Sequence, residues 1–293
     1  MTTSGETDSI YVLNDGSSEA EHERLNLQHR LFDDIMQNTL LPPHIHSSIT
    51  ETSKAPKVLD LATGTGIWLT SVAKTLPPDS ELVGLDFDTS KFPPAGSLPP
   101  NITLSKGNIF EPFPADLHGR FDVVNVRLIL LALKVGDGTA LMKNVMSLLK
   151  PGGFVVWSET GPTVQAVEPP SFAFYKFQDI HWRYAKQFGG DLNLPLGMVA
   201  YIKEAGYTEC GDRAYPGGSQ LYTRQDWLER SHRQVMTFIP QTLRGIVSLG
   251  GVEGMETKEQ VDELVAELRK DFVGDRKVHP LFMRAWGKKP EAS

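Results

Sequence analysis

Cysteine is almost absent from this sequence: Cys210 is the one cysteine among 293 residues. A single thiol cannot form a disulfide within its own chain, and disulfide-rich chains are typical of oxidising compartments. The cysteine usage therefore gives no indication of an oxidising environment.

Long hydrophobic runs are lacking as well. A membrane-spanning helix needs about 18 or more consecutive apolar residues, and the longest candidate, residues 121–133, is interrupted by Asp122, Asn125 and Arg127. The first ten residues, MTTSGETDSI, are polar and acidic, unlike a secretory signal. We therefore expect no membrane partner and a cytoplasmic location.

An excess of basic residues is missing too. The chain has 29 Lys and Arg residues against 36 Asp and Glu residues, a formal net charge of −7 at pH 7. A protein that holds nucleic acid by its phosphates needs a basic surface. We therefore expect no nucleic-acid partner, and we also predict no metal site.

What the chain does contain is an alternation of strand and helix patterns. Apolar runs predict buried strands at residues 57–62, 81–87, 102–109, 120–128 and 153–159. Strands separated by helical stretches of this kind are typical of a parallel sheet with right-handed crossovers. Two later segments, 207–215 and 279–289, bring the predicted number of strands to seven. The predicted fold class is α/β and Rossmann-like, with a mostly parallel sheet and helices on both faces.

Three further segments are predicted to be helical. Residues 19–41 carry apolar side chains at roughly helical spacing, and Pro42-Pro43 is expected to end that helix. Residues 160–192 form an aromatic-rich insertion, and residues 224–273 contain the amphipathic stretch TKEQVDELVAELRKDF. We expect the two insertions, at about 160–200 and 224–275, to form a lid over a substrate.

The stretch VLDLATGTGIW, residues 58–68, ends a predicted strand with Gly64 and Gly66. Glycines at such a turn let a ligand approach the backbone closely. A loop for a nucleoside triphosphate is excluded, because no Lys-Ser/Thr pair follows Gly66. A dinucleotide loop is disfavoured, because Leu69 occupies the position where a small residue lets helix and strand pack together.

Asp60, in the same stretch, indicates a ligand without phosphate. A carboxylate beside the loop would repel a phosphate but attract the ammonium group of S-adenosylmethionine (SAM). Ala62, Gly64 and Gly66 would then supply the backbone that approaches the ligand. SAM, with S-adenosylhomocysteine as the product, is the predicted cofactor.

Asp86 lies twenty residues after Gly66, at the end of the second predicted strand. A carboxylate at this place accepts the ribose hydroxyls in NAD and SAM sites alike, so it supports an adenosine ligand. Phe87 is expected to cover the adenine. Asn108 is expected to hydrogen-bond the adenine edge, with the backbone of Ile109 beside it.

Asn125 and Arg127 lie at or beyond the end of the fourth predicted strand, where open α/β sheets place their ligands. An arginine among apolar neighbours is costly to bury unpaired, so we expect Arg127 to pair with a carboxylate. The partner of Arg127 either stabilises the fold or belongs to the ligand site.

Five motifs, VLDLATGTGIW, LVGLDFD, GNIFEPFP, FDVVNVRLIL and LKPGGFVVWSE, resemble in order and spacing those of the class I SAM-dependent methyltransferases. The resemblance covers about residues 55–160 and continues more weakly to the carboxyl terminus. The segment from Glu21 to His29, E-x-x-R-L-x-x-Q-H, resembles fungal natural-product methyltransferases, such as amide N-methyltransferases of gliotoxin-type pathways and regulators similar to LaeA. One departure is Ala62, where many class I enzymes carry a glycine.

This resemblance implies a seven-stranded sheet whose last strand, about 279–287, is antiparallel. It also implies that residues 1–50 form a helical cap over the cofactor of a methyltransferase domain at 51–293. Tyr11, Arg24 and Gln28 would then contact the amino-acid end of SAM.

Candidate residues for the reaction are two histidines. His29 lies in the cap and His181 in the aromatic insertion, and either is a candidate general base if the nucleophile must lose a proton of high pKa. Glu159, at the end of the fifth predicted strand, is a candidate for substrate contact.

The predicted activity is methyl transfer to an oxygen or nitrogen atom of a small specialised metabolite. An aromatic-lined pocket would suit an apolar polycyclic or peptide-derived molecule. A different reaction in the same SAM site, and a LaeA-like regulatory role, are the alternatives.

Overall fold

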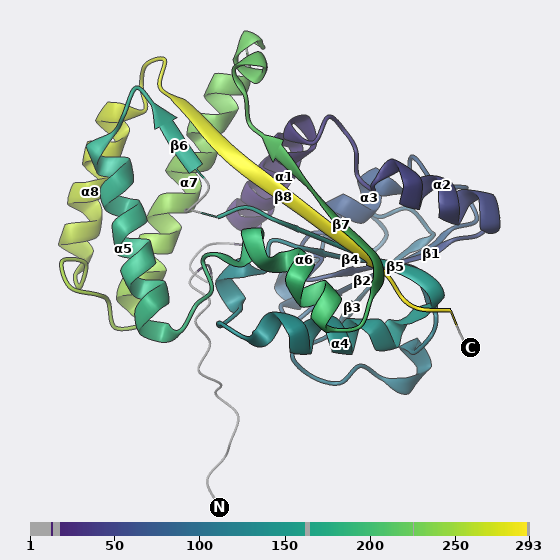
Figure 1. Cartoon of the computed structure of the whole chain (residues 1–293). Helices are drawn as coiled ribbons and strands as arrows, with labels where there is room; N and C mark the ends of the chain where they lie inside the picture. The colour runs from purple at the N-terminus through teal and green to yellow at the C-terminus, as the bar shows by residue number, and fades with distance from the viewer. Residues whose placement is uncertain (1–12, 14–17, 162–164, 225, 292–293) are drawn as a thin grey trace, which may run out of the picture.

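A mixed, mostly parallel sheet forms the centre of the protein (Figure 1). The computed structural model describes residue 13 and residues 18–161, 165–224 and 226–291. In this part of the chain the sheet has eight strands in the order β3-β2-β1-β4-β5-β8-β6, and β7 also pairs with β8. The strands are β1 (Lys57–Leu61), β2 (Glu81–Asp86), β3 (Ile102–Lys106), β4 (Phe121–Arg127), β5 (Leu149–Glu159), β6 (Gln165–Glu168), β7 (Thr208–Pro216) and β8 (Lys277–Lys288).

The direction of the strands agrees with the prediction. Strands β1 to β5 are parallel, and β8 runs antiparallel to β5, β6 and β7. The seven predicted strands are therefore confirmed, and so is the antiparallel last strand.

The eighth strand, β6, was not predicted and lies in a segment expected to be helical. Strand β8 is long enough to extend beyond β5, because only its residues 283–288 pair with β5. The backbone groups of residues 277–280 would otherwise be unpaired on that edge, and β6 provides their hydrogen-bonding partners.

Helices cover both faces of the sheet. Their bounds are α1 (Ser18–Ile35), α2 (Pro43–Thr52), α3 (Ile67–Val72), α4 (Asp137–Leu148), α5 (Phe172–Phe188), α6 (Leu194–Glu204), α7 (Trp227–Ser248) and α8 (Lys258–Asp271). Successive strand residues point to opposite faces, so Leu59 packs in the cluster with α4 and α6, whereas Val58 packs in the cluster with α2 and α3.

The amino-terminal helix is shorter than predicted. Helix α1 ends at Ile35, and Pro43 is the first residue of a second helix, α2, that was not predicted. The fixed φ of proline suits the first turn of a helix, where its missing N–H is not needed. The proline pair therefore starts α2 and does not end α1.

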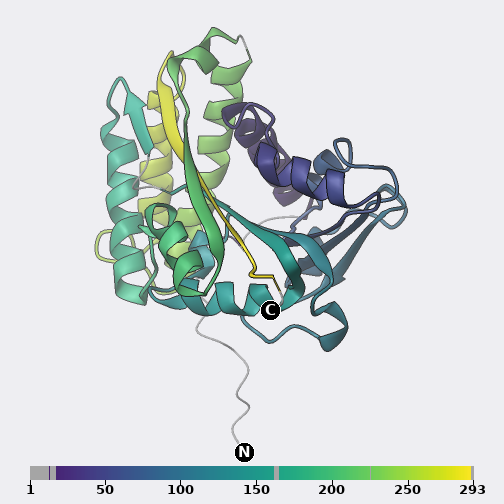
Figure 2. The same ribbon diagram turned by 45° about the vertical axis from the view of Figure 1, so that its right-hand side comes forward.

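Helices α5, α7 and α8 form a group away from β1, β2 and β3 (Figures 1 and 2). They share a buried apolar cluster that includes Phe174, Ile239 and Leu264. Helix α1 contacts α7, and Asp34 of α1 lies 2.8 Å from the guanidinium of Arg230. None of the helices in the described residues is long and apolar enough to cross a membrane.

Gly84, in the middle of β2, lies where the sheet packs closely against Thr63 of the predicted cofactor loop. A Cβ atom there would lie 2.5 Å from Leu104 Cδ2 and 2.8 Å from Thr63 Cγ2. We expect Gly84→Ala to lower the free energy of unfolding by about 1–3 kcal/mol through overpacking, as measured by urea denaturation. The matched control is Gly197→Ala in α6, where the nearest atom would be Tyr201 Cε2 at an ordinary 3.5 Å, and which should be neutral or stabilising. Equal stability of the two variants would contradict the prediction.

Candidate active site

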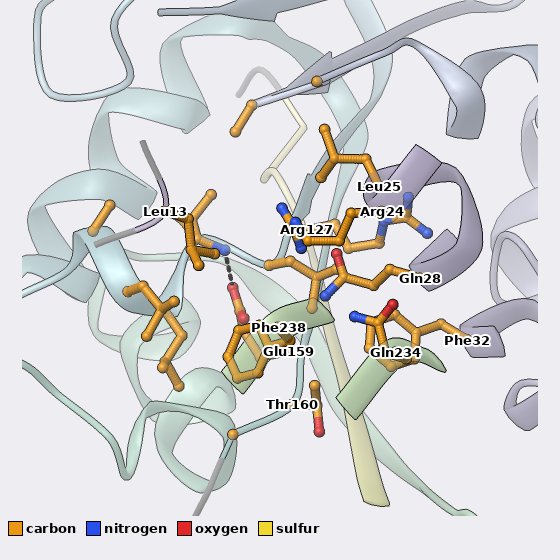
Figure 3. Close-up of a pocket in the computed structure, with 18 of the residues that line it drawn as sticks. Leu13, Arg24, Leu25, Gln28, Phe32, Arg127, Glu159, Thr160, Gln234 and Phe238 are labelled. Carbon is orange, nitrogen blue, oxygen red and sulfur yellow. Dashed lines mark hydrogen bonds between the residues drawn. The ribbon is translucent and has the colours of Figure 1, made fainter. Parts of the chain in front are cut away.

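A large cavity lies at the carboxyl ends of β1, β2, β4 and β5 (Figure 3). Its volume is about 580 Å³, within the range of small-molecule sites. Its walls come from the sheet, from α1, and from α5 and α7. The sheet order changes direction between β1 and β4, which is where open α/β sheets bind their ligands.

The turn after β1 forms one end of this cavity. Ala62 and Gly64 line it, with φ of +55° and +56°. Ala62 thus adopts the left-handed conformation that glycine takes most readily. Gly66 does not line the cavity but caps α3 from behind, with its N–H donating to Thr63 O at 3.0 Å.

Asp60 is a buried carboxyl beside this turn. The register pairs Asp60 with Asn125 across β1 and β4, and Asn125 Nδ2 donates to Asp60 Oδ1 at 2.7 Å. Thr63 Oγ1 donates to Asp60 Oδ2, also at 2.7 Å. Burial raises the pKa of Asp60 to about 6, although Arg127 and both hydrogen bonds act in the opposite direction. Asp60 lines the cavity, whereas Asn125 holds Asp60 without lining it.

Asp86, at the end of β2, also lines the cavity. Its Oδ2 accepts the Gly64 N–H at 2.7 Å and its Oδ1 accepts the Asp88 N–H at 2.9 Å. A carboxylate oxygen has two lone pairs, so each oxygen can accept a further hydrogen bond from a ligand. Asp86 therefore shapes the glycine turn and remains competent to bind hydroxyl groups.

The predicted adenine-binding residues lie on the same side of the cavity. Phe87, Asn108 and Ile109 all line it. The Phe87 ring is 67% exposed, and the Lys106 ammonium lies 5.4 Å from its centroid. The Asn108 amide donates to Glu111 Oε1 at 3.0 Å.

Helix α1 contributes Arg24 and Gln28 to the cavity wall (Figure 3). Arg24 is buried and donates from Nε and Nη2 to the carboxylate of Glu21 at 2.7 and 2.6 Å. Tyr11, the third predicted residue at the amino-acid end of SAM, lies outside the described residues.

Arg127 reaches the cavity from the end of β4, and its pKa is lowered by burial. Its Nη1 lies 2.9 Å from His29 Nδ1. The expected direct pairing with a carboxylate is therefore wrong: in the described chain the hydrogen-bond partner is His29. Carboxylates act on Arg127 through space, with the charge of Asp60 having the largest effect.

His29 is buried next to the cavity but does not line it. An arginine can only donate, so His29 Nδ1 accepts and Nε2 carries the ring hydrogen. Nε2 lies 2.8 Å from Ser71 Oγ and 3.0 Å from Asp33 Oδ2. Burial lowers the pKa of His29, which favours this neutral ring. The geometry therefore favours a positioning role for His29, which holds Arg127. It does not favour the role of a general base.

His181 of α5 does line the cavity. The side chain is fully buried, and its ring lies 5.6 Å from the ring of Phe177. Burial lowers the pKa of His181 to about 4, so the ring is neutral at pH 7. Its Nδ1 has no hydrogen-bond partner among the described residues.

Glu159, at the end of β5, is the most strongly shifted acid in this wall of the cavity. Its Oε1 accepts the Ile129 N–H at 2.8 Å and the Trp157 Nε1–H at 3.1 Å. Its Oε2 has no hydrogen-bond partner within the described part of the chain. Burial raises the pKa of Glu159 to about 8. Its place at a strand end was the sequence signal, but the shift in pKa comes from burial, which the sequence pattern did not indicate.

Sequence reasoning placed the segment of α7 in the expected lid but named none of its cavity residues. Ser231, Gln234 and Phe238 line the cavity from this helix. Their spacing of three or four residues places them on one helix face. That periodicity predicts a helix, but it does not indicate which part of the protein this helix face packs against.

The fold and the site together define a class of protein. A sheet of this order, a glycine turn after β1 with a buried acid beside it, and a carboxylate at the end of β2 are the features of a class I SAM-binding domain. The family model described as methyltransferase domain matches residues 25–229. The chain belongs to this family and is a SAM-dependent methyltransferase.

Relatives agree with this assignment. The chain is 33% identical over 206 residues to methyltransferase grgD of Penicillium sp., covering 68% of this chain and 69% of that protein. It is 27% identical over 264 residues to N-methyltransferase tcpN of Claviceps purpurea, covering 88% and 92%. The resemblance to fungal natural-product methyltransferases is thereby confirmed.

Solved structures with partial similarity include a cyclase and an N-methyltransferase. The [4+2]-cyclase SpnF has a TM-score of 0.49 and 13% identity, with 94% of this chain and 98% of that chain covered. Phosphoethanolamine N-methyltransferase 2 of Haemonchus contortus, in complex with SAM, has a TM-score of 0.48 and 17% identity, with 95% and 61% covered.

The shifted acid predicts a pH dependence of stability. Folded Glu159 keeps its proton up to about pH 8, whereas the ordinary pKa of 4.5 leaves the unfolded side chain ionised. The folded state thus binds more protons between these values, so raising the pH favours unfolding. We expect the free energy of unfolding to fall by about 1 kcal/mol between pH 7 and 8 from this group. Urea denaturation across this range measures it.

The control separates Glu159 from other acids. Glu159→Gln should remove the decline, whereas Glu168→Gln, an exposed change of the same chemistry, should keep it. The groups Asp60 and His181, with pKa values of about 6 and about 4, titrate mostly below this window. A wild-type profile that does not differ from that of Glu159→Gln would contradict the prediction.

Proposed function

We propose that the protein transfers a methyl group from SAM to a nitrogen or oxygen atom of a small, largely apolar specialised metabolite. The observation that supports this most directly is the continuity of the cavity. It extends from the glycine turn to a chamber walled by apolar side chains of α5 and α7, among them Phe174, Phe177 and Ile239. One end fits a cofactor, and the other fits an acceptor.

The turn end of the cavity has the chemistry that SAM requires. SAM carries an ammonium group, a sulfonium group and a ribose diol. A buried carboxyl with a raised pKa, such as Asp60, fits a cation, because a nearby positive charge favours its ionised form. Asp86 offers free lone pairs to two hydroxyls at the proper strand end. Asp60 and Asp86 therefore fit the ammonium or sulfonium cation and the ribose diol of SAM.

The remaining cofactor contacts follow from the cavity wall. Phe87, Asn108 and Ile109 would surround the adenine, and the backbone at Ala62 and Gly64 would lie against the amino-acid part. Arg24, Gln28 and Arg127 would face its charged end, while Asn125 and Gly66 hold the site from behind. Helix α1 would cap the bound cofactor.

Bound SAM supplies an electrophilic methyl carbon, which a nucleophile takes by in-line displacement from sulfur. The protein's own contribution is to hold an acceptor in line and to exclude water, and positioning alone can supply much of the rate. The apolar walls from α5 and α7 serve this purpose by enclosing the acceptor. His181, neutral and buried in that wall, is one candidate base, and Glu159 lines the same cavity.

Nitrogen is the favoured acceptor atom. The relatives tcpN, verN and gliN are named as N-methyltransferases. The acceptor of this chain is therefore sought first among small molecules with N–H groups.

The function is tested by incubating the purified protein with isotope-labelled SAM and metabolite extracts of a producing fungus. Label in a small product, with one S-adenosylhomocysteine formed per product, is the expected result. S-adenosylhomocysteine absent while another product forms would indicate a different reaction. No labelled product together with no SAM binding would reject the proposal.

The cofactor assignment is tested by Asp86→Asn. Loss of the charged hydrogen-bond acceptor should weaken SAM binding by about 1–3 kcal/mol, or roughly 5- to 150-fold in Kd, measured by calorimetry. Asp116→Asn, the same change at an exposed position, is the matched control and should leave Kd unchanged. An unchanged Kd for Asp86→Asn would mean that the ribose is held elsewhere.

A further inference from the structure

The acceptor chamber contains polar atoms that have no partner. We define the chamber as the part of the cavity wall from Glu159 onwards in the sequence: Glu159, Thr160, Gly161, Gln165, Phe174, Phe177, His181, Trp227, Ser231, Gln234, Val235, Phe238, Ile239, Val278 and Pro280. Four of its buried polar atoms, Glu159 Oε2, His181 Nδ1, Gln234 Oε1 and Trp227 Nε1, have no hydrogen-bond partner among the described residues. Leaving such an atom unsatisfied costs about 1–3 kcal/mol. The amide oxygen of Gln234 and Oε2 of ionised Glu159 are acceptors, so a ligand with an N–H donor would satisfy them.

The chamber also lacks positive charge. None of its fifteen described residues is Lys or Arg, and His181 is neutral because burial lowers its pKa to about 4. Of the basic residues of the cavity, Arg24, Lys91, Arg127 and Lys134, none belongs to the chamber as defined, and Arg127 is the one whose charge acts on Glu159. A phosphate or carboxylate acceptor would find no counter-ion among the chamber residues themselves, and burying it unpaired would be costly.

Glu159 is the best placed of the four groups. Two donors, the Ile129 N–H and the Trp157 Nε1–H, hold Oε1 and thereby fix the plane of the carboxyl. Figure 3 shows this carboxyl among the residues that line the cavity, with Arg127 and Gln234 also in the wall. The second oxygen, Oε2, is left for a ligand.

We propose, on the basis of the function proposed above, that Glu159 is a catalytic residue that recognises an uncharged N–H acceptor: Oε2 takes the hydrogen bond from this N–H and then its proton. His181 and Gln234 provide further hydrogen-bonding atoms in the same chamber. In the step, a nitrogen–carbon bond forms, the carbon–sulfur bond breaks with its electron pair left on sulfur, and the N–H proton moves to ionised Glu159.

The electrostatic surroundings suit this role. Burial favours the protonated carboxyl, whereas hydrogen bonds from Ile129, Trp157 and Leu130 and the positive charge of Arg127 on β4 act against it. On α5 the facing titratable group, His181, is neutral. On β8, Arg284 donates to Ser158 Oγ and Thr39 O instead. A bound N–H donor would shift Glu159 towards the ionised form, so the acceptor itself prepares the base.

The test replaces the hydrogen-bond acceptor at Glu159 Oε2 by a donor. Glu159→Gln keeps the size of the side chain and an Oε1 that can accept from Ile129 and Trp157, but places an NH₂ donor where Oε2 lies. The probes are three uncharged bicyclic molecules of similar shape: indole, with one N–H donor; 1-methylindole, with none; and quinoline, with one acceptor. Calorimetry at pH 9 on protein saturated with S-adenosylhomocysteine measures their affinities.

Wild-type protein should bind indole about tenfold or more tightly than 1-methylindole, as one charge-assisted hydrogen bond implies. This preference should weaken as the pH falls below about 8. Glu159→Gln should lose the preference and bind quinoline more tightly than wild type does. Glu168→Gln, the exposed control, should behave like wild type.

Three results would overturn the proposal: equal binding of indole and 1-methylindole by wild type, an unchanged indole preference in Glu159→Gln, or no binding of any probe at its solubility limit. SAM affinity, measured in parallel, distinguishes failure of the role of Glu159 from failure of the proposed function. Normal SAM binding and methyl transfer without a donor preference would reject only the role of Glu159. Loss of SAM binding in wild type would instead reject the function on which it rests.

Discussion

The hydrogen bond between Asn125 and Asp60 is the contact on which the rest of the site depends. It joins β1 to β4 at the point where the sheet order reverses, and it holds a carboxyl that is almost completely buried. A buried carboxyl needs such partners, because without them its ionised form is strongly disfavoured. With Asn125 and Thr63 in place, Asp60 stands at a fixed position beside the glycine turn. Asp86 then fixes the turn itself by accepting the Gly64 N–H.

The same edge of the sheet gathers several ionisable groups in a dry environment. Asp60 and Glu159 have raised pKa values, and those of Arg127 and His29 are lowered, in each case with burial as the largest cause. Such groups are destabilising for a fold alone, and strongly perturbed groups cluster at functional sites. A cationic cofactor at one end and an N–H donor at the other would supply the missing partners. The site is thus electrostatically incomplete without its ligands.

Local spacing made much of this predictable, and its failures have physical causes. The strand pattern and the distance from Gly66 to Asp86 fixed the cofactor end, because ligand contacts there follow directly from strand ends. Strand β6 and helix α2 were missed, since one forms only to pair an open edge of β8 and the other starts at a proline pair that also looks like a stop. The sequence alone makes His29 a candidate base, because a sequence cannot show that this side chain contacts Arg127 and does not line the cavity.

By itself the sequence determined the fold class, the cofactor and the residues of the turn, because these depend on contacts between strand ends that the topology brings together. Only the tertiary structure decided what closes the other end of the cavity. The helical period of α7 requires an apolar face but leaves open its partner, and packing against α1 and α5 directs Gln234 and Phe238 to the cavity. Burial, likewise, is a property of the assembled molecule, and it is burial that raises the pKa of Glu159.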